Sequence, residues 1–413
     1  MGNRAGLGLW WGEIDSKEFG QDGAMTIASL FYLSAGTMPS PVANEIQAVK
    51  MAQAFAPVVE RFELIVSGNL RSRLGLEREF TARFNQWYGV RVPFTVTRIP
   101  SLTWRTPFPF PEGSYSPRKY LRWAIAYCRR QQPTAVYTRT PYLVAPLLAA
   151  GLPVVLEFHE PITPKILAHE WLQHPNLITI VTLAEELRSQ YIQQGCDPDK
   201  ICIAPSAVDL APFQPAQAKP TARQALNLAT DQPIALYAGN LYAYKGIPTI
   251  LQAATQLPDC QFILVGGQRK EVDRVRSQAD ALGLHNLHLT GYKTQAELPP
   301  YLFAADCLLL PTSQQWKLAS TTSPLKLFEY MAAQRPIIAS DLPNIATVLR
   351  DRHNGRLIPP DDPDAMADAI RNLLADPVAG DAIAAQAWQD VQAHTWAQRA
   401  ATILQFIAPR LPH

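Results

Sequence analysis

Short apolar runs rich in β-branched residues alternate with amphipathic segments from residue 25 onward, and the alternation occurs in two series. This pattern is typical of βαβ units, in which helices cross over between parallel strands. A stretch at 214–220 separates the two series and is interpreted as a linker. We therefore predict an α/β protein with two doubly wound parallel sheets, which would border a cleft with the carboxyl ends of their strands.

The predicted strands are short, and several are continuously apolar, as in buried parallel sheets. In the first series we expect strands at 26–33, 63–66, 94–98, 135–138, 154–158, 177–181 and 201–204. In the second series we expect them at 234–238, 261–265, 287–290, 307–310 and 336–339. Helices are expected at 44–56, 247–256, 272–282 and 366–374, with one long helical stretch at 383–408.

The length of 413 residues agrees with two or three domains. Residues 1–24 are predicted to be a disordered leader or an over-extended start, because their only apolar stretch, 7–11, is too short for the core of a signal peptide. We place an N-terminal, acceptor-side domain at 25–215 and a second domain at 216–385. The final segment, 386–413, is predicted to be a helix that crosses back to the first domain.

Charge is nearly balanced over the whole chain, but not locally. There are 37 Lys and Arg residues against 35 Asp and Glu, a formal net charge of +2. Between Arg61 and Arg139, however, fourteen basic residues stand against four acidic ones, a local net charge of +10. A solvated basic face would explain this stretch, and so would attraction to an anionic membrane surface or to a phosphate-bearing acceptor. Nucleic acid is not expected as a partner, since no RNA- or DNA-binding signature accompanies the stretch.

The cysteines and the hydropathy pattern point to a cytoplasmic protein. The five cysteines are odd in number and lack CxxC spacing, so they encode neither a disulfide framework nor a zinc site and fit a reducing cytosol. No apolar run reaches the roughly 18 to 20 residues of a membrane-spanning helix. The carboxylates of Asp197 and Asp199 have a metal-like spacing but are interpreted as part of a loop, and no GxGxxG motif occurs. We expect no metal, and either a soluble protein or one attached peripherally to the inner membrane face.

The segment 323–332 carries the strongest local signal for ligand binding. Ser323 suits the N-cap of a helix and Pro324 its first position, so the helix would begin there with its free backbone amides exposed. Such a helix start binds phosphate through those amides and the helix dipole. Glu329 lies just under two turns further on, and its carboxylate could accept hydrogen bonds from both hydroxyls of a ribose. An N-capped helix is also common where no ligand binds.

A turn about eighty residues earlier strengthens the signal. Strand 234–238 runs into Gly239, Asn240 and, after four more residues, Lys245 and Gly246, where glycine permits a tight turn and lysine can neutralise a phosphate. Short motifs then follow in order at 264–267, 290–292, 304–306 and 310–312, and close on 328–332 and 336–341. This ordered series, over roughly 233–377, resembles the donor-binding domain of the family 4 retaining glycosyltransferases.

The resemblance implies a GT-B architecture with two Rossmann-like domains, and it implies roles for individual residues. His159 follows strand 154–158, where the family places a histidine that contacts the transferred sugar, although a lone histidine at a strand end is often structural. Lys245 would stabilise charge on the departing diphosphate, and Glu329 would fix the ribose. The implied donor-binding residues are Gly36 in the loop 34–40, Gly239, Asn240, Gly266, Gly291, Tyr292, Thr321, Thr322, Ser323, Pro324, Leu325 and Lys326. A plain turn would explain Gly36 nearly as well.

Two positions depart from the family pattern. Thr321 stands where the family commonly has the first of two glutamates, the one that binds hydroxyls of the donor sugar. Asn240 stands where the family often has arginine, which leaves Lys245 as the only cation of the usual phosphate-binding pair. Lys326 is a candidate to supply part of the missing charge.

The resemblance implies a retaining glycosyltransferase that moves a hexosyl group from a UDP- or GDP-sugar to an unidentified acceptor, such as a lipid or a cell-surface polysaccharide precursor. A phosphate oxygen of the leaving group would accept the acceptor's proton, so no cofactor is expected. Two alternatives stay open. One is a nucleotide-sugar epimerase on the same architecture, and the other is a scaffold that binds nucleotide sugars but has lost catalysis through the departures at 240 and 321.

Overall fold

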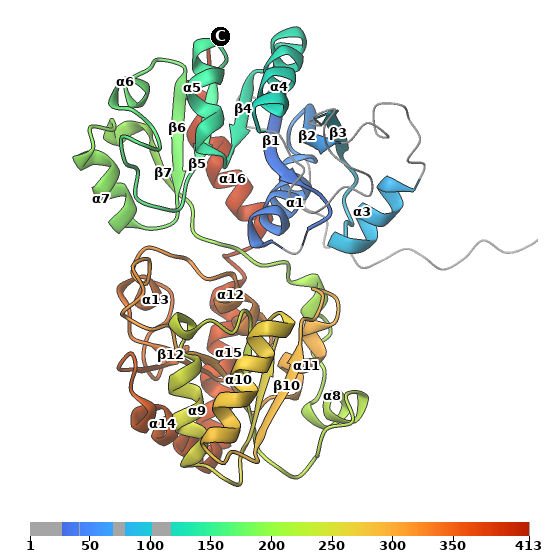
Figure 1. The fold of residues 1–413 in the computed structure, drawn as a ribbon, viewed down its shortest axis with the longest axis vertical. Coiled ribbons are helices and arrows are strands. Elements are labelled where there is room, and N and C mark those ends of the chain that lie inside the picture. Colours follow the sequence, from blue (N-terminus) through green and yellow to red (C-terminus); the bar gives the residue numbers. More distant parts are fainter. Residues whose placement is uncertain (1–26, 41, 69–78, 101–116, 413) are drawn as a thin grey trace, which may run out of the picture.

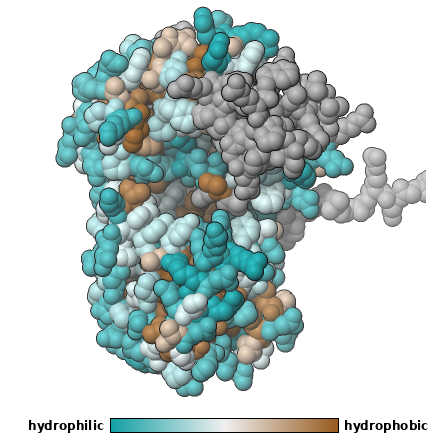
Figure 2. Space-filling model, viewed as in Figure 1, coloured by the Kyte–Doolittle hydropathy of each residue, from teal (hydrophilic) through white to brown (hydrophobic). Residues whose placement is uncertain are grey.

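A computed structural model describes residues 27–40, 42–68, 79–100 and 117–412. The predicted leader and the stretch at 101–116, in the middle of the basic segment, lie outside these residues. The described chain forms two α/β domains, one above the other in Figure 1. In the space-filling view the outline narrows between the two lobes, whose surface is mostly hydrophilic (Figure 2).

The N-terminal domain is built on a seven-stranded sheet in the order β3-β2-β1-β4-β5-β6-β7, in which neighbouring strands run parallel. The inner strands β4, β5 and β6 are buried along their whole length because helices cover both faces of the sheet. The strands are β1 (Ser29–Thr37), β2 (Arg61–Gly68), β3 (Thr95–Pro100), β4 (Ala135–Thr138), β5 (Val154–Glu157), β6 (Leu177–Thr182) and β7 (Ile201–Ile203). The helices are α1 (Ala43–Phe55), α3 (Phe80–Tyr88), α4 (Pro117–Gln131), α5 (Pro141–Ala149), α6 (His169–Leu172) and α7 (Glu185–Gln193), with a 3-10 turn η1 (Pro198–Lys200).

The C-terminal domain is built on a six-stranded parallel sheet in the order β10-β9-β8-β11-β12-β13, also between two apolar clusters. Its strands are β8 (Ile234–Ala238), β9 (Gln261–Val265), β10 (Leu287–Gly291), β11 (Cys307–Leu310), β12 (Ile337–Ser340) and β13 (Arg356–Ile358). Its helices are α8 (Lys219–Ala225), α9 (Ile247–Thr255), α10 (Arg269–Ala281), α11 (Leu298–Ala304), α12 (Leu325–Ala332), α13 (Pro343–Ala346), α14 (Pro363–Ala375) and α15 (Pro377–Val391). Short 3-10 turns are η2 (Ala211–Phe213) and η3 (Ala243–Lys245).

The two predicted series of strands are therefore present, and the prediction of two doubly wound parallel sheets is confirmed. The sequence missed β13, which has only three residues. The predicted loop at 34–40 was also wrong in its first half, because β1 continues to Thr37. After an irregularity, Thr37 resumes the parallel register of the sheet opposite Ser67.

The chain crosses between the domains twice, and the crossings lie side by side. Ala207 packs in the N-terminal core and Val208 in the C-terminal core, so the first crossing precedes the stretch 214–220, which leads into α8 and is not the linker between domains. The backbone N–H of Val208 donates to the carbonyl of His394 in the second crossing at 2.9 Å, which ties the two segments together.

The predicted long helix at 383–408 is two helices. The first, α15, ends at Val391 in the C-terminal core, and α16 (Trp396–Ile407) begins after Thr395, whose hydroxyl accepts from the backbone N–H of Gln398 at 3.2 Å. This cap lets the chain change direction between the two domains. Helix α16, followed by η4 (Ala408–Arg410), packs on the N-terminal domain beside α1 (Figure 1).

Among the described residues, no helix is both long and apolar enough to cross a membrane. The five cysteines are buried, and none forms a disulfide. No group of three or more His, Cys, Asp or Glu side chains in the described ranges is arranged to hold a metal ion.

Candidate functional site

Three glycines that were predicted to bind the donor, Gly239, Gly266 and Gly291, lie together where β8, β9 and β10 end. The N–H of Gly239 donates to the carbonyl of Val265 at 2.8 Å, and the N–H of Gly266 donates to that of Gly291 at 2.9 Å. A Cβ atom on Gly266 would lie 2.3 Å from the carbonyl oxygen of Gly239, and the φ of Gly266 is +125°, so only glycine fits there. The three strand ends thus present bare backbone next to one another, as close approach of a ligand requires.

Two lysines reach the end of β8 from different elements. The Nζ of Lys326, on α12, donates to the hydroxyl of Tyr237 at 2.9 Å, and a Cβ on Gly239 would lie 2.3 Å from this Nζ. Lys245 ends η3, and its Nζ lies 3.9 Å from the ring centre of Trp316. Burial lowers the pKa of Lys245 to about 8. Burial and the neighbouring Lys245 together hold the pKa of Lys326 well below its ordinary value, so the two ammonium groups lie close enough to influence each other.

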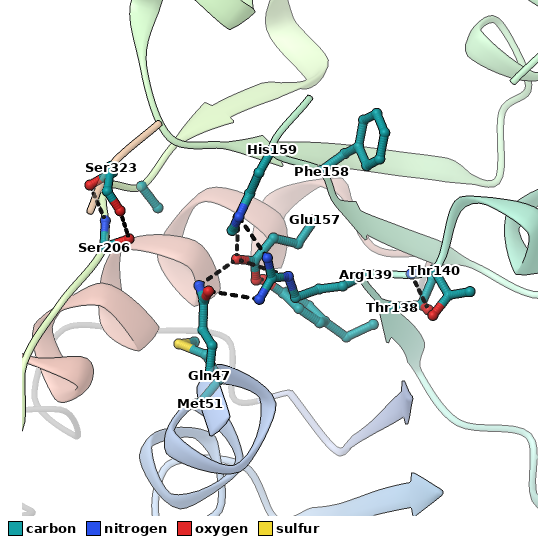
Figure 3. A network of polar contacts seen from close by, with 12 residues as sticks. Gln47, Met51, Thr138, Arg139, Thr140, Glu157, Phe158, His159, Ser206 and Ser323 are labelled. Atoms are coloured by element: carbon teal, nitrogen blue, oxygen red, sulfur yellow. Dashed lines mark hydrogen bonds and ion pairs between the residues drawn. The ribbon is translucent and has the colours of Figure 1, made fainter. Parts of the chain in front are cut away.

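The start of α12 differs from the prediction. The helix begins at Leu325 with Pro324 in the N-cap position, and Ser323 does not cap it. Instead, the hydroxyl of Ser323 accepts from the backbone N–H of Ser206 at 2.9 Å, and the hydroxyl of Ser206 donates to the carbonyl of Ser323 at 2.6 Å (Figure 3). Leu325 packs against the N-terminal core. The first turn of α12 therefore lies at the junction of the two domains.

Other predicted donor-binding residues take different positions around this junction. Thr321 is buried and its hydroxyl donates to the carbonyl of Leu318 at 3.4 Å, and the carbonyl of Thr322 accepts from the side chain of Asn344. Asn240 is exposed, and its carbonyl accepts from the Tyr237 hydroxyl at 2.7 Å.

Two further predicted residues lie close to the N-terminal domain. Burial raises the pKa of Glu329, while Lys326 and Lys50 on α1 favour its charged form, so Glu329 is near both domains. Burial raises the pKa of Tyr88 on α3, and Tyr292 contributes to the same shift. Tyr292, half exposed, is therefore close to α3 across the domain junction.

His159 lies in a dense polar network at the ends of β4 and β5 (Figure 3). Its Nδ1 lies 2.6 Å from an Nη of Arg139, and its Nε2 lies 2.7 Å from Oε1 of Glu157. Because a guanidinium only donates and a carboxylate only accepts, Nδ1 is the acceptor and Nε2 carries the proton. Burial, and next the charge of Arg139, lower the pKa of His159 to about 4, so the imidazole is neutral and both its nitrogens are engaged within the N-terminal domain.

Glu157 is the centre of this network and is fully buried. Its carboxylate accepts from Arg399 on α16 at 2.8 Å, from the side-chain amide of Gln47 at 3.0 Å and from the hydroxyl of Tyr137. Burial alone would raise the pKa of Glu157, but Arg399 and Arg139 hold it well below its usual range. One carboxylate thus faces two guanidinium groups in the interior.

Arg399 also joins this network to the crossings between the domains. Its Nε donates to the carbonyl of Pro205 at 2.8 Å and an Nη donates to that of Ala204 at 3.1 Å, both in the first crossing. The same guanidinium bonds Glu157, two residues before His159. The crossing segments and the predicted sugar-contacting histidine are therefore parts of one polar network.

Gly36 lies in β1, next to a buried acid on α1. A Cβ on Gly36 would lie 2.2 Å from Oε1 of Glu45, so the missing side chain makes room for this carboxylate. Burial raises the pKa of Glu45, and its Oε2 has no hydrogen-bond partner among the residues that the structure describes.

Sequence reasoning missed several residues around the predicted ones. In the network around His159 they are Glu157, Arg139, Gln47 and Arg399, and beside the two lysines they are Tyr237 and Trp316. Glu157 did leave a signal, since it is a carboxylate at the end of an otherwise apolar buried strand and requires a cation. Nothing in the sequence identified that cation, because Arg399 is 242 residues away.

Comparisons with known proteins agree with this geometry. Residues 232–376 match the family described as Glycosyl transferases group 1. The chain is similar to a D-inositol 3-phosphate glycosyltransferase of Xylanimonas cellulosilytica, 27% identical over 259 residues, which are 59% of this chain and 60% of the relative. It is also similar to a phosphatidyl-myo-inositol mannosyltransferase of Mycolicibacterium smegmatis, 32% identical over 165 residues, which are 39% of this chain and 41% of the relative. The chain thus spans 60% or less of these relatives.

A solved structure matches across both domains. HepE of Anabaena, in complex with UDP and glucose, has a TM-score of 0.67 and 17% identity, over 91% of this chain and 99% of that protein. Two parallel sheets, joined by paired crossings and matched by this structure, define a GT-B fold. Over 232–376 the chain is thus similar to the group 1 glycosyltransferases, and the curated relatives with which it aligns carry glycosyltransferase names.

Proposed function

We propose that the protein is a retaining glycosyltransferase of family 4 that transfers a hexosyl group from a UDP- or GDP-sugar to an acceptor hydroxyl. The observation that carries the proposal is the pair of partly buried lysines, Lys245 and Lys326, which reach the bare backbone at the end of β8. Burial and mutual repulsion disfavour the charged forms of both lysines, and a bound anion would favour them again. A diphosphate supplies that charge, and the family match and relatives support a nucleotide sugar as its source.

In this proposal the donor lies across the strand ends of the C-terminal domain. Lys245, Lys326 and the first-turn amides of α12 stabilise the charge that develops on the departing diphosphate. Glu329 holds the ribose hydroxyls, and the glycine backbone, with Asn240, Tyr292 and the segment 321–325, borders the nucleotide. No metal takes part, and a phosphate oxygen of the leaving group accepts the proton of the acceptor.

His159 has a narrower role than a free histidine would have. Because its nitrogens are bonded to Arg139 and Glu157, it is held as a neutral ring at the strand end and orients the sugar without acting as an acid or base. Gly36 and Glu45 border the N-terminal side of the same junction.

The proposal is tested by mass spectrometry of products formed from a panel of UDP- and GDP-sugars, with cell extract as the acceptor. HepE was crystallised with UDP and glucose, which makes UDP-glucose the first donor to try. Release of nucleoside diphosphate only when acceptor is present supports transfer. An epimerised donor without acceptor indicates an epimerase, and binding without turnover across the panel indicates a scaffold.

Removing either lysine is expected to weaken binding of UDP. Lys245→Met and Lys326→Met should each reduce affinity about 10- to 100-fold, because each removes a charge-assisted hydrogen bond to phosphate. Isothermal titration calorimetry measures the change. The control is Lys270→Met, which removes an exposed lysine on α10 and should leave the affinity unchanged. Wild-type affinity for UDP in all three variants would contradict the proposal that the diphosphate binds between Lys245 and Lys326.

We further propose that the acceptor is held at an anionic membrane surface on the cytoplasmic side, through the N-terminal domain. Part of the positive charge between Arg61 and Arg139 is not available to a membrane. Arg61 pairs with Glu63 at 2.5 Å, and Arg139 is in the buried network around Glu157. On α4, however, four basic or aromatic side chains are exposed: Arg122, Trp123, Arg129 and Arg130.

This membrane proposal predicts a salt-dependent interaction. The protein should float with vesicles that contain phosphatidylglycerol at low salt and detach at high salt, because electrostatic binding weakens as ions screen it. Pure phosphatidylcholine vesicles serve as the control. Flotation that is equal with both vesicle types, or absent with both, contradicts the proposal.

A further inference from the structure

Both lysines at the end of β8 rest on aromatic rings instead of carboxylates. In the described part of the chain neither Nζ lies within ion-pair distance of an acid; Glu329 is near enough to favour the charged form of Lys326, but no ion pair joins them. We propose that Trp316 and Tyr237 are positioning residues that hold Lys245 and Lys326 ready for the diphosphate of the donor. This inference rests on the proposed function and names how its anion site is built.

Trp316 is braced in a stack of three rings. Its ring lies 4.9 Å from that of Tyr244, with 22° between their planes, and Tyr244 in turn stacks on Tyr242 at 5.3 Å. The loop that carries Trp316 is tied to the turn that carries Lys245, because the N–H of Ser313 donates to the carbonyl of Tyr244 at 3.1 Å. The indole therefore has a fixed position, and it fixes the ammonium group 3.9 Å above it.

Tyr237 holds Lys326 in two ways. The Nζ lies 4.1 Å from the centre of the phenol ring and donates to the hydroxyl at 2.9 Å. The hydroxyl of Tyr237 donates to the carbonyl of Asn240 at 2.7 Å, so a lone pair of its oxygen accepts from the lysine. Tyr237 is fully buried in β8, which gives the contact a rigid base.

A neutral holder has a chemical consequence that a carboxylate lacks. A carboxylate would neutralise the ammonium group and compete with phosphate for its protons, whereas an aromatic ring attracts the cation without cancelling its charge. The rings thus keep both side chains in place while their charge stays available to a doubly charged ligand.

The same arrangement links diphosphate binding to protons. The groups that face Lys326 are Tyr237 from β8, Lys245 from η3 and Glu329 from its own helix, and Lys50 from α1 lies near Glu329. Burial lowers the pKa of Lys245 to about 8 and holds the pKa of Lys326 well below the ordinary value of lysine. A bound anion favours the charged forms, so the protein takes up protons when a diphosphate binds near pH 8.

The test measures binding of UDP, uridine and inorganic pyrophosphate by titration calorimetry. Trp316→Leu, which removes the ring under Lys245, and Tyr237→Phe, which keeps the ring but removes the hydroxyl that accepts from Lys326, should each weaken binding of UDP and pyrophosphate about 3- to 30-fold and leave binding of uridine unchanged. Trp316→Phe, which keeps a ring, should restore most of the affinity. Titrations at pH 8 in two buffers of different ionisation enthalpy should reveal proton uptake in the wild type, reduced in Tyr237→Phe.

The control is Phe406→Leu, which removes a ring that lies 4.0 Å from the guanidinium of Arg410 in the N-terminal domain. It should bind all three ligands like the wild type. Trp316→Leu and Tyr237→Phe with wild-type affinity for UDP and pyrophosphate, or with equal losses for uridine, would overturn the inference.

The outcomes also separate the inference from the proposed function. Ring-dependent pyrophosphate binding without affinity for any nucleotide sugar would preserve the inference and remove the proposed donor. Donor turnover that is unchanged in both Trp316→Leu and Tyr237→Phe would preserve the proposed function and remove the inference.

Discussion

Glu157→Gln should lower the free energy of unfolding by about 3–5 kcal/mol, because it leaves Arg399 and Arg139 buried without a counter-charge. Urea denaturation at pH 7, followed by circular dichroism, measures the change. The matched control is Glu160→Gln, an exposed acid beyond the same strand end, which should stay within about 0.5 kcal/mol of the wild type. A loss in Glu157→Gln no larger than in this control would contradict the assigned balance of charge.

A second measurement on the same variant uses pH. The depressed pKa of Glu157 means that its contribution to stability is present above the unfolded value near 4.5 and disappears as pH falls through the folded value. His159, with its pKa lowered to about 4, is neutral when folded and gains a proton when unfolded, so stability also declines as pH falls below about 6.5. Wild-type stability should therefore decrease steadily from pH 7 to pH 4, and below pH 5 the decrease should be smaller in Glu157→Gln. Because the double variant Glu157→Gln with Arg399→Met removes both members of the main pair, it should recover part of the lost stability.

Gly246→Ala should destabilise the C-terminal domain by about 3–5 kcal/mol and abolish measurable binding of UDP. The residue has a φ of +81°, and an added Cβ would lie 1.7 Å from the backbone carbonyl oxygen of Pro311. The turn η3 and the end of β11 would have to separate, and Lys245 would move away with η3. Denaturation and calorimetry on the same preparation measure both effects.

The matched control for this substitution is Gly283→Ala. Gly283 also has a positive φ, +66°, but a Cβ there would meet no atom within 4 Å. Its substitution should cost only the conformational strain, about 1–2 kcal/mol, and leave binding unchanged. If the two variants behave alike, contact between η3 and β11 has no part in the donor site.

The repeated strand pattern predicted both sheets, because buried parallel strands are mostly apolar wherever they lie in the chain. Local signals were less reliable where a distant partner intervened. Ser323 looked like a helix cap, yet its hydroxyl bonds Ser206 in the other domain, 117 residues away. The break in the predicted final helix at Thr395 has a similar origin, since the neighbouring His394 accepts from Val208.

The same limit applies to the candidate site. The glycines and lysines around β8 were predictable, since they lie in short motifs within one domain. The aromatic rings beneath the lysines were not, because a pattern of residue types does not specify which ring a flexible side chain will rest on. Thr321, where the family commonly has a glutamate, is buried, and its hydroxyl bonds the carbonyl of Leu318 in its own loop.

The return of α16 to the N-terminal domain affects the order in which the protein can be completed during synthesis. Most of this domain leaves the ribosome first, but Glu157 then has Arg139 and Gln47 as partners while Arg399 is still untranslated. The N-terminal core is likewise open where Trp396, Ala400 and Ile403 will pack. Of these two domains, the N-terminal one therefore emerges first but is finished last, because it is closed only after the C-terminal domain has been made.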